Sequence, residues 1–475
     1  MRKQAEIKTT LQPHQKRALI KALRNNLILA HGTGTGKTLT AIAIADALGK
    51  PATALVPAPL VANFKKEIAK HKQGGPDIQV MSLPTAVRRN LRIPVGSTLI
   101  VDEAHALRNP DTKRQNYVRQ LLQRAGRVYA LTGTPGYNDV TDWASLINIV
   151  AKRPVVPVQD AEFKKRYINQ IKVPPTLWAR LLYRAKPGVV QQLKNVKELR
   201  RAFEPYVDVF DKEIEKPKVI DESIEVPMSE DQTLLYRYLE GNLPSEIRYK
   251  LRHNLPPSKQ EAKQLNSFLT GVRQASNTTR SFSEALTPEQ LEQQSTKLRE
   301  AADRLAKMYR NDPNFRGLVY SNFIGSGVEP YGELLKRRGI PYRTFTGALD
   351  AKEKKQVVDD YNSGKIPVII GSGSASEGLD LKGTKLIQLL DPHFNEARLD
   401  QVIGRGVRYK SHAHLPESER QVKVQRYYST LPDDRSWLGK LFTSPTTSVD
   451  QYLSSRAQEK QQLMNQVTQL FRPEN

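Results

Sequence analysis

The sequence contains no cysteine among its 475 residues. This absence excludes disulfide bridges, thiolate metal ligands and cysteine nucleophiles. The eight histidines have no close carboxylate partners at zinc spacing, so we expect no structural metal. There is no run of about twenty apolar residues, and no apolar stretch follows the basic start Met1-Arg2-Lys3, so neither a membrane span nor a signal peptide is predicted. We therefore expect an intracellular protein, cytoplasmic or in the nucleoid (host-cell cytoplasm if viral).

Acidic residues are also scarce relative to basic ones. The chain has 74 Lys and Arg against 49 Asp and Glu, which gives a formal charge of +25 and a pI near 9.9. A field of this sign attracts polyanions, and nucleic acid is the default polyanion. The charge is spread along the chain, which favours a track over a basic tail. Charge alone leaves open a soluble basic protein without such a partner.

Short apolar runs alternate with helical patterns in residues 1–150. The runs occur at 26–30, 53–56, 98–101 and 128–131, and two of the helical patterns lie at 38–48 and 60–71. Brief apolar runs bounded by polar or turn residues are typical of parallel strands with both faces covered. The alternation predicts a doubly wound α/β domain, in which ligands bind at the carboxyl ends of the strands.

The remaining chain divides into three predicted segments. Residues 151–294 are expected to form a mostly helical linker or protrusion, with capping boxes at Ser229–Gln232 and Thr287–Gln290. The dense Lys and Arg there are also compatible with a solvated helix face. Residues 295–430 should form a second α/β domain, with strands at 317–321, 368–371 and 386–390. Residues 431–475 should form a C-terminal helical extension.

A glycine-rich loop has the pattern of a phosphate-binding loop. It consists of His31, Gly32, Thr33, Gly34, Thr35, Gly36, Lys37 and Thr38. Its glycines allow backbone N–H groups to point at phosphate oxygens. Lys37 would reach the β- and γ-phosphates, and Thr38 would ligate magnesium. The strict pattern has glycine where His31 stands, and a glycine-rich turn with an incidental lysine is the alternative interpretation.

Two adjacent carboxylates, Asp102 and Glu103, follow the apolar run at 98–101. Because neighbouring side chains project differently at a strand end, the two can divide the work. Asp102 would hold magnesium, and Glu103 would orient and deprotonate the attacking water. His105 is too far along the chain to be the base, so we assign it to coupling. Two acids at a strand end are otherwise a common loop ending.

A third motif comprises Gln401, Arg405 and Arg408, which are spaced four and three residues apart. This spacing predicts that they share one helical face. A glutamine and two guanidinium groups on one stripe suit a γ-phosphate presented by the other domain. We expect Arg408 to be an arginine finger, a group worth about 10³–10⁵ in rate, and Arg405 to be a supporting charge. A solvated basic helix face is the alternative.

The order of these motifs resembles superfamily 2 helicases and translocases, in particular the SWI/SNF-type branch. The segments that carry the resemblance are Leu11-x-x-His14-Gln15, residues 31–38, Asp102-Glu103-Ala104-His105, residues 131–138, Tyr320-Ser321-Asn322-Phe323, residues 372–381 and Asp391-Pro392-His393-Phe394-Asn395. The resemblance implies two tandem RecA-like parallel-sheet domains with a helical insertion and a C-terminal helix. Residues 401–420 and 448–452 more narrowly resemble viral DNA-dependent ATPases, such as poxvirus nucleoside triphosphate phosphohydrolase I and the early transcription factor small subunit.

The resemblance also implies roles for single residues. Besides the phosphate loop, the implied nucleotide contacts are Gln15, as the adenine reader, Gly378 and Asp380. The residues implied to couple hydrolysis to movement are His105, Thr132 and Thr134. The implied nucleic-acid contacts are Pro57, Arg108, Thr346, Ser374 and Ser376.

The sequence therefore predicts an ATP-dependent DNA translocase that uses ATP and Mg²⁺, with duplex tracking favoured. Single-stranded DNA stays open as a track, RNA is less favoured, and a polymerase or a replication or transcription factor is a candidate partner. One alternative is a strand-separating helicase on DNA or RNA. Another is a nucleic-acid-binding scaffold with an inactive ATPase site, against which the intact Lys37, Asp102, Glu103 and Arg408 argue.

Overall fold

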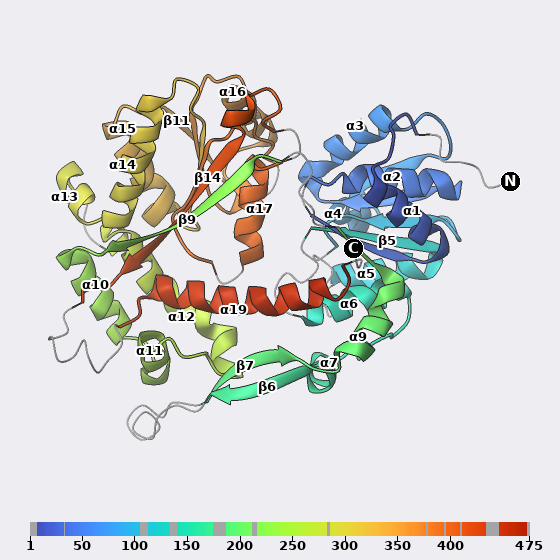
Figure 1. The fold of residues 1–475 in the computed structure, drawn as a ribbon, viewed down its shortest axis with the longest axis horizontal. Coiled ribbons are helices and arrows are strands. Elements are labelled where there is room, and N and C mark those ends of the chain that lie inside the picture. The colour runs from blue at the N-terminus through green and yellow to red at the C-terminus, as the bar shows by residue number, and fades with distance from the viewer. Residues whose placement is uncertain are drawn as a thin grey trace. The chain divides into compact units, whose positions relative to one another are not determined.

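The computed structural model describes residues 7–32, 34–104, 113–133, 140–173, 187–210, 216–282, 286–376, 379–393, 396–408, 411–433 and 446–472. The chain divides into two compact units, each assembled from separate stretches. Unit 1 comprises Met1–Asn169, Gln191–Ile214 and Lys460–Asn475, and unit 2 comprises Gln170–Val190 and Glu215–Glu459. Each unit is built around a six-stranded sheet (Figure 1). No helix in the described ranges is both long and apolar enough to cross a membrane.

The sheet of unit 1 is entirely parallel and has the order β3-β2-β4-β5-β1-β8. Its strands are β1 (Leu27–His31), β2 (Ala52–Val56), β3 (Ile78–Ser82), β4 (Thr98–Val101), β5 (Arg127–Thr132) and β8 (Val207–Phe210). The four strands expected in residues 1–150 are confirmed as β1, β2, β4 and β5. The two strands that the sequence did not predict, β3 and β8, lie at the two edges of the sheet.

Both faces of this sheet are covered, which explains its short apolar strands. In β1, Leu27 and Leu29 pack in one core cluster while Ile28 and Ala30 pack in the other. The first cluster contains side chains from α1, α2 and α3, and the second contains side chains from α4, α5, α6, α7 and α9. The helices of unit 1 are α1 (Pro13–Arg24), α2 (Lys37–Leu48), α3 (Val61–His71), α4 (Leu83–Arg88), α5 (Lys113–Arg124), α6 (Thr141–Ala151), α7 (Asp160–Tyr167) and α9 (Val196–Phe203).

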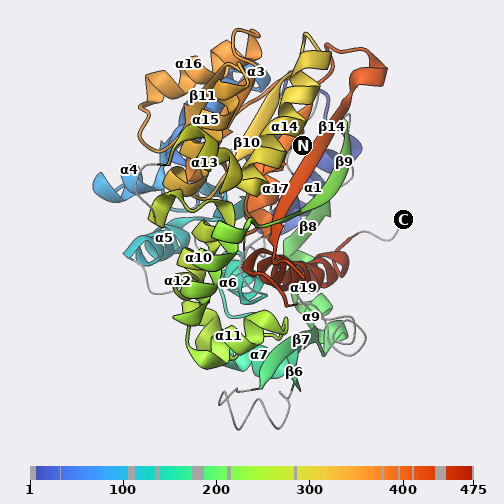
Figure 2. The same cartoon turned by 90° about the vertical axis from the view of Figure 1, so that its left-hand side faces the viewer.

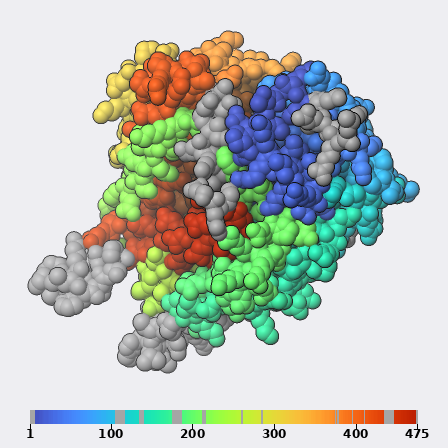
Figure 3. All heavy atoms as spheres, turned by 45° about the vertical axis from the view of Figure 1, so that its right-hand side comes forward, coloured from blue at the N-terminus to red at the C-terminus, as the bar shows by residue number. Residues whose placement is uncertain are grey.

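The described part of residues 151–294, the segment expected to be mostly helical, also contains four strands. Two of them, β6 (Ile168–Val173) and β7 (Gly188–Leu193), form a separate two-stranded sheet. The other two join the main sheets: β8 pairs with β1, and β9 (Lys218–Pro227) becomes an edge strand in unit 2. The segment is therefore partly built into both units. In the space-filling view, the green surface that includes α9 is continuous with the teal surface of unit 1 (Figure 3).

The sheet of unit 2 is also parallel, with the order β11-β12-β10-β13-β14-β9. Its further strands are β10 (Gly317–Tyr320), β11 (Tyr342–Phe345), β12 (Val368–Gly371), β13 (Leu386–Leu389) and β14 (Gln421–Thr430). The expected strands at 317–321, 368–371 and 386–390 are confirmed as β10, β12 and β13. The doubly wound α/β class therefore holds for both units.

Helices cover both faces of the unit 2 sheet (Figure 2). Side chains of α13, α14 and α15 pack on one face, and side chains of α16 and α17 pack on the other. A third cluster joins α10, α11 and α12 to the beginning of the C-terminal helix α19 (Val449–Gln469). The helices of unit 2 are α10 (Glu230–Gly241), α11 (Ser245–Arg252), α12 (Lys259–Asn277), α13 (Pro288–Gln293), α14 (Thr296–Asn311), α15 (Glu329–Arg337), α16 (Ala351–Asn362) and α17 (Glu396–Gly406).

Two local predictions for this part of the chain are confirmed. Ser229 and Thr287 each cap a helix through a reciprocal capping box, and Pro288 occupies the first turn of α13. The helical extension expected in residues 431–475 contains α19 (Val449–Gln469). Its residues up to Glu459 belong to unit 2 and those from Lys460 belong to unit 1. Three side chains near its end lie in the core of unit 1: Leu463, Met464 and Val467.

A buried ion pair holds the start of α19 in unit 2. Lys297 Nζ lies 2.6 Å from Asp450 Oδ2, and the two side chains are 0% and 1% exposed. Asp450 also accepts hydrogen bonds from the Ser429 backbone N–H and the Ser276 hydroxyl. The Asp450 carboxylate thus provides the counter-charge for the buried Lys297 ammonium.

We expect Asp450→Ala to destabilise unit 2 by about 3–5 kcal/mol, because it leaves a buried lysine without its counter-charge. Urea unfolding followed by tryptophan fluorescence and far-UV circular dichroism measures the change. Asp359→Ala is the matched control, because Asp359 pairs with Lys355 on an exposed face of α16. Equal midpoints for the two variants would contradict a structural role for the buried pair.

Candidate active site

The phosphate-loop motif connects the end of β1 to the start of α2. Gly34 and Gly36 have φ angles of 77° and 80°, in the left-handed region that favours glycine. A Cβ atom on Gly36 would lie 2.5 Å from Gln15 Nε2, so no other residue fits there without displacing that amide. The loop therefore leads directly into a helix N-terminus, whose N–H groups attract anions. Thr33 lies outside the described residues.

Lys37, the first residue of α2, points back into this loop. Its Nζ donates to the carbonyl oxygens of His31, at 2.8 Å, and Gly32, at 3.1 Å. Thr38 follows in the first turn of α2 and is partly exposed. An ammonium, a hydroxyl and a helix N-terminus at one strand end have the chemistry to hold a triphosphate. The roles assigned to Lys37 and Thr38 stay predictions.

The acidic pair lies at the end of β4, on the same edge of the sheet. Because only β5 separates β1 from β4, the two strand ends are two strand spacings, about 10 Å, apart. The Asp102 N–H donates to the Leu55 carbonyl, and Asp102 Oδ1 accepts from the Glu103 N–H at 2.9 Å. Glu103 has a φ of 49°, a backbone conformation that is costly for a residue other than glycine and that often marks functional sites.

The oxygen groups at this edge fit a magnesium ion that shares its ligands with phosphates. Across the described ranges, no group of three or more His, Asp or Glu side chains could hold a metal by itself. Magnesium is usually held by one or two carboxylates together with substrate phosphates and waters, so it needs no such group. Asp102 and Thr38 supply ligands of the right kind.

Helix α1 supports the loop through the two residues that the upstream motif singled out. Gln15 is buried; its Oε1 accepts from the Gln12 N–H, and its Nε2 donates to the Gly36 carbonyl at 3.3 Å. His14 donates through Nε2 to the Thr35 carbonyl at 2.9 Å. Gln15 therefore lies against the phosphate loop, and its reading of adenine stays a prediction.

A group that the sequence did not predict lies behind the loop on β8. His31 Nε2 is 2.8 Å from Asp208 Oδ1, and the Arg17 guanidinium donates to both oxygens of the same carboxylate. Burial lowers the pKa of His31 despite the nearby carboxylate, so its Nε2–H is the donor at neutral pH. Burial would raise the pKa of Asp208, but the hydrogen bonds from His31 and Arg17 outweigh it and lower that pKa.

The remaining site residues predicted in unit 1 are partly described. Thr132 is buried at the end of β5 and pairs in register with Ala30, directly before the phosphate loop. Pro57 follows β2 and precedes a short helical turn, Ala58–Leu60. The other three residues, His105, Arg108 and Thr134, lie outside the described residues.

In unit 2, the structure brings Arg408 and Asp380 together. Arg408 Nη1 lies 3.1 Å from Asp380 Oδ1, and Arg408 Nε donates to the Gly404 carbonyl. The expectation that Gln401, Arg405 and Arg408 share one helical face is wrong for Arg408, because α17 ends at Gly406. The Ser411 hydroxyl accepts from the Arg408 N–H and so satisfies a backbone donor outside the helix.

The other residues predicted in unit 2 follow strand ends or lie on α17. Gln401 and Arg405 are four residues apart on α17. Thr346 directly follows β11, and Ser374 and Ser376 belong to the helical turn Gly373–Ser376 after β12. Gly378 lies outside the described residues.

Two motif segments of unit 2 meet at the buried carboxylate of Asp391. Its Oδ2 accepts from the Ser321 hydroxyl and from the Asn322 N–H, both at 2.6 Å. Asn277 at the end of α12 donates to Oδ1, and Arg273 on the same helix donates to the Pro392 carbonyl. The sequence placed α12 in a separate helical segment and offered no signal for these contacts.

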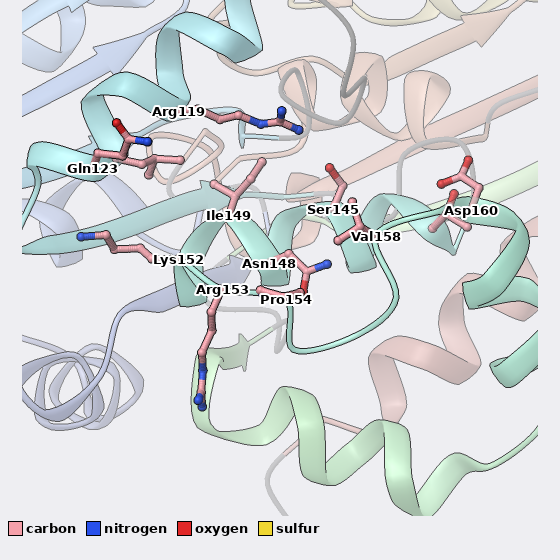
Figure 4. Close-up of a pocket in the computed structure, with 12 residues that line it drawn as sticks. Arg119, Gln123, Ser145, Asn148, Ile149, Lys152, Arg153, Pro154, Val158 and Asp160 are labelled. Atoms are coloured by element: carbon pink, nitrogen blue, oxygen red, sulfur yellow. The ribbon is translucent and has the colours of Figure 1, made fainter.

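A hollow of about 340 Å³ in unit 1 lies between α5 and α6 (Figure 4). None of its lining residues belongs to the phosphate loop or to the acidic pair. Two of its cations are already engaged: Lys152 donates to the Ala125 carbonyl and Arg153 to the Tyr206 hydroxyl. The motifs, rather than this hollow, therefore locate the candidate site.

Two family models match consecutive parts of the chain. Residues 88–281 match the SNF2-related domain, and residues 300–410 match the helicase conserved C-terminal domain. The matched ranges include Asp102 and Glu103 in unit 1 and Asp380, Gln401 and Arg408 in unit 2.

Proteins similar to this chain occur in viruses. A protein of Acanthamoeba polyphaga mimivirus named "Putative ATP-dependent RNA helicase" is 28% identical over 97% of this chain and 96% of its own length. A "Termination factor NPH-I homolog" of African swine fever virus is 24% identical over 92% of this chain and 74% of its own length. The solved Sulfolobus solfataricus SWI2/SNF2 ATPase core in complex with dsDNA aligns over 90% of each chain, at 18% identity and a TM-score of 0.38, which is too low to support an argument about function.

Proposed function

We propose that this chain, a nucleic-acid-dependent ATPase of the SNF2-related branch of superfamily 2 helicases, hydrolyses ATP to ADP and phosphate while tracking along duplex DNA. The observation that carries the proposal is a pair of strand ends on one edge of the unit 1 sheet, with only β5 between them. One bears the phosphate loop with Lys37, and the other bears Asp102 and Glu103.

In this proposal the residues at the strand ends divide the chemistry. The loop N–H groups and Lys37 bind the β- and γ-phosphates, and Glu103 orients the attacking water and accepts its proton. Thr38 and Asp102 are the residues that would hold Mg²⁺, which when bound neutralises phosphate charge. The left-handed backbone of Glu103 supports the proposal, because strained backbone at a strand end is typical of catalytic residues.

In this proposal, unit 2 supplies a positive charge that acts on the γ-phosphate during hydrolysis. We assign Arg408 to the negative charge that develops on the γ-phosphate, with Arg405 and Gln401 in support. Arg408 is 29% exposed and paired with an exposed Asp380 carboxylate. A surface pair of this kind is weak, typically below about 1 kcal/mol, so it can hold the guanidinium between turnovers without preventing its use.

The charge of +25 supports a nucleic-acid track contacted mainly through phosphates. The proposed contacts are Pro57, Arg108, Thr346, Ser374 and Ser376. The mimivirus relative is named as an RNA helicase, so a strand-separating helicase on DNA or RNA is the second candidate function. A scaffold with an inactive site is disfavoured, because the phosphate loop is formed and Lys37 is turned into it.

The test is steady-state ATP hydrolysis with no nucleic acid, single-stranded DNA, blunt duplex DNA and RNA at equal nucleotide concentration. We expect the largest stimulation with duplex DNA. If six or more phosphates are contacted, DNA affinity should fall by about 10³-fold or more between 50 and 200 mM salt. Lys37→Ala is the control and should abolish both basal and stimulated turnover.

Displacement assays separate the two candidates. Tracking without unwinding predicts ATP-dependent displacement of a triplex strand and no separation of a forked duplex. Separation of forked DNA or RNA would support the helicase instead. Hydrolysis that no nucleic acid stimulates would contradict both.

A further inference from the structure

The phosphate loop has a support on β8 that none of the predicted motifs includes. Strand β8 pairs with β1 in parallel, and His31 stands opposite Phe210 in the register. Asp208 and His31 are nearly inaccessible to solvent, at 4% and 0% exposure. An ionised group is therefore buried next to the loop that would bind phosphates.

Burying a carboxylate is costly unless donors surround it. Asp208 has three: the Nε2–H of His31, at 2.8 Å, and the Nε–H and Nη2–H of Arg17, at 3.0 and 2.9 Å. The Arg17 guanidinium also donates to the Val209 carbonyl, which fixes it against β8. The Asp208 carboxylate thus accepts three hydrogen bonds, and one of them comes from His31, the first residue of the loop.

His31 also contacts the loop lysine. The carbonyl oxygen of His31 accepts from Lys37 Nζ at 2.8 Å. Asp208 therefore anchors the side chain of the same residue whose backbone carbonyl holds the ammonium. This anchoring matters because phosphate binding depends on a preorganised cradle of donors.

A second set of contacts from β8 reaches both ends of the loop. The Phe210 carbonyl accepts from the Gly32 N–H at 2.8 Å. The Phe210 ring stacks on His14 with centroids 3.7 Å apart, and His14 in turn donates to the Thr35 carbonyl. Strand β8 therefore holds the start of the loop directly and its later part through α1.

We propose that Asp208 is a positioning residue for nucleotide phosphates, acting through His31, with Arg17 holding the carboxylate in place. The inference rests on the proposed function, because it assumes that the loop binds ATP. Asp208 on β8 lies 177 residues from His31 in the sequence. This distant strand would then help to set the affinity of the loop for a triphosphate. The bond to Asp208 also gives a reason for histidine where the phosphate-loop pattern has glycine.

The test compares KM with kcat for ATP. We expect Asp208→Asn to raise KM about tenfold, the loss of a charge-assisted hydrogen bond, while kcat at saturating ATP changes by less than about threefold. Glu204→Gln is the matched control, because it removes one exposed negative charge from the same stretch of chain and should leave both constants unchanged. A general loss of folding would instead lower kcat through the fraction of active protein.

Two variants of His31 approach the same bond from the loop side. His31→Leu fills the space without a donor and should raise KM as Asp208→Asn does, whereas His31→Gln keeps a donor and should restore most of the affinity. The double variant, Asp208→Asn with His31→Leu, should be no worse than the poorer single one. These variants decide the question if Asp208→Asn fails to fold.

Wild-type KM in folded Asp208→Asn or His31→Leu protein would overturn the inference, as would equal KM values for His31→Leu and His31→Gln. Failure of the proposed function is recognised separately. If the proposed ATPase function is wrong, Lys37→Ala keeps its ATPase activity. If only the inference about Asp208 is wrong, Lys37→Ala is inactive and the Asp208 and His31 variants behave as wild type.

Discussion

Replacing Arg408 with alanine is expected to lower kcat for ATP hydrolysis by about 10³–10⁵-fold, the range measured for arginine fingers. KM for ATP should change little, because the residue acts mainly on charge that develops during the reaction. Steady-state hydrolysis at saturating ATP and duplex DNA measures the effect. The structure supports an individual role, because Arg408 lies beyond the end of α17 and pairs with Asp380.

Lys355→Ala is the matched control for this variant. It removes an exposed cation from α16 in the same unit, where Lys355 pairs with Asp359 at the next turn. We expect wild-type turnover from it. If Arg408→Ala retained most of its activity while Arg405→Ala lost it, the finger would be Arg405 and the assignment of Arg408 would be wrong.

Glu103→Gln is expected to lower kcat by about 10²–10⁴-fold, the usual contribution of a general base. The substitution keeps the size of the side chain and removes its ability to accept a proton. ATP affinity should be retained, because the loop and Lys37 are untouched. Single-turnover hydrolysis measures the chemical step, and titration with a fluorescent ATP analogue measures binding.

Glu162→Gln, an exposed position on α7 in the same unit, is the control for charge removal. A Glu103→Gln variant that hydrolysed ATP at the wild-type rate would exclude Glu103 as the base and would shift attention to Asp102. Weakened ATP binding in Glu103→Gln would indicate that the left-handed backbone at residue 103 serves to shape the loop and not the chemistry.

The strands that could be predicted from the sequence are those with both faces buried. All residues of β1, β4, β10 and β12 are buried, so each is an unbroken apolar run. In the edge strands β3 and β11, exposed polar residues follow a partly buried first residue, and these polar side chains hide the strand pattern. Strand β8 was missed because the buried Asp208 interrupts its apolar residues.

The candidate site divides in the same way between local and distant determinants. The phosphate loop and the acidic pair could be identified because each is a short continuous segment at a strand end. The supports could not, because Asp208 lies 177 residues from His31 and Asn277 lies 114 residues from Asp391. Helical periodicity placed Arg408 on α17, but the helix ends at Gly406 and the Ser411 hydroxyl accepts from the Arg408 N–H. Residue spacing alone does not predict where a helix ends.

The discontinuous composition of unit 1 has a consequence for the way the protein is made. Its sheet lacks β8 until residue 210 has been synthesised, and its core lacks Leu463, Met464 and Val467 until residue 467 has been synthesised. Domains generally fold during synthesis as their residues emerge. Unit 1 cannot complete its core until α19 has emerged from the ribosome, so the nascent chain is expected to expose apolar surface until then and to depend on chaperones during that time.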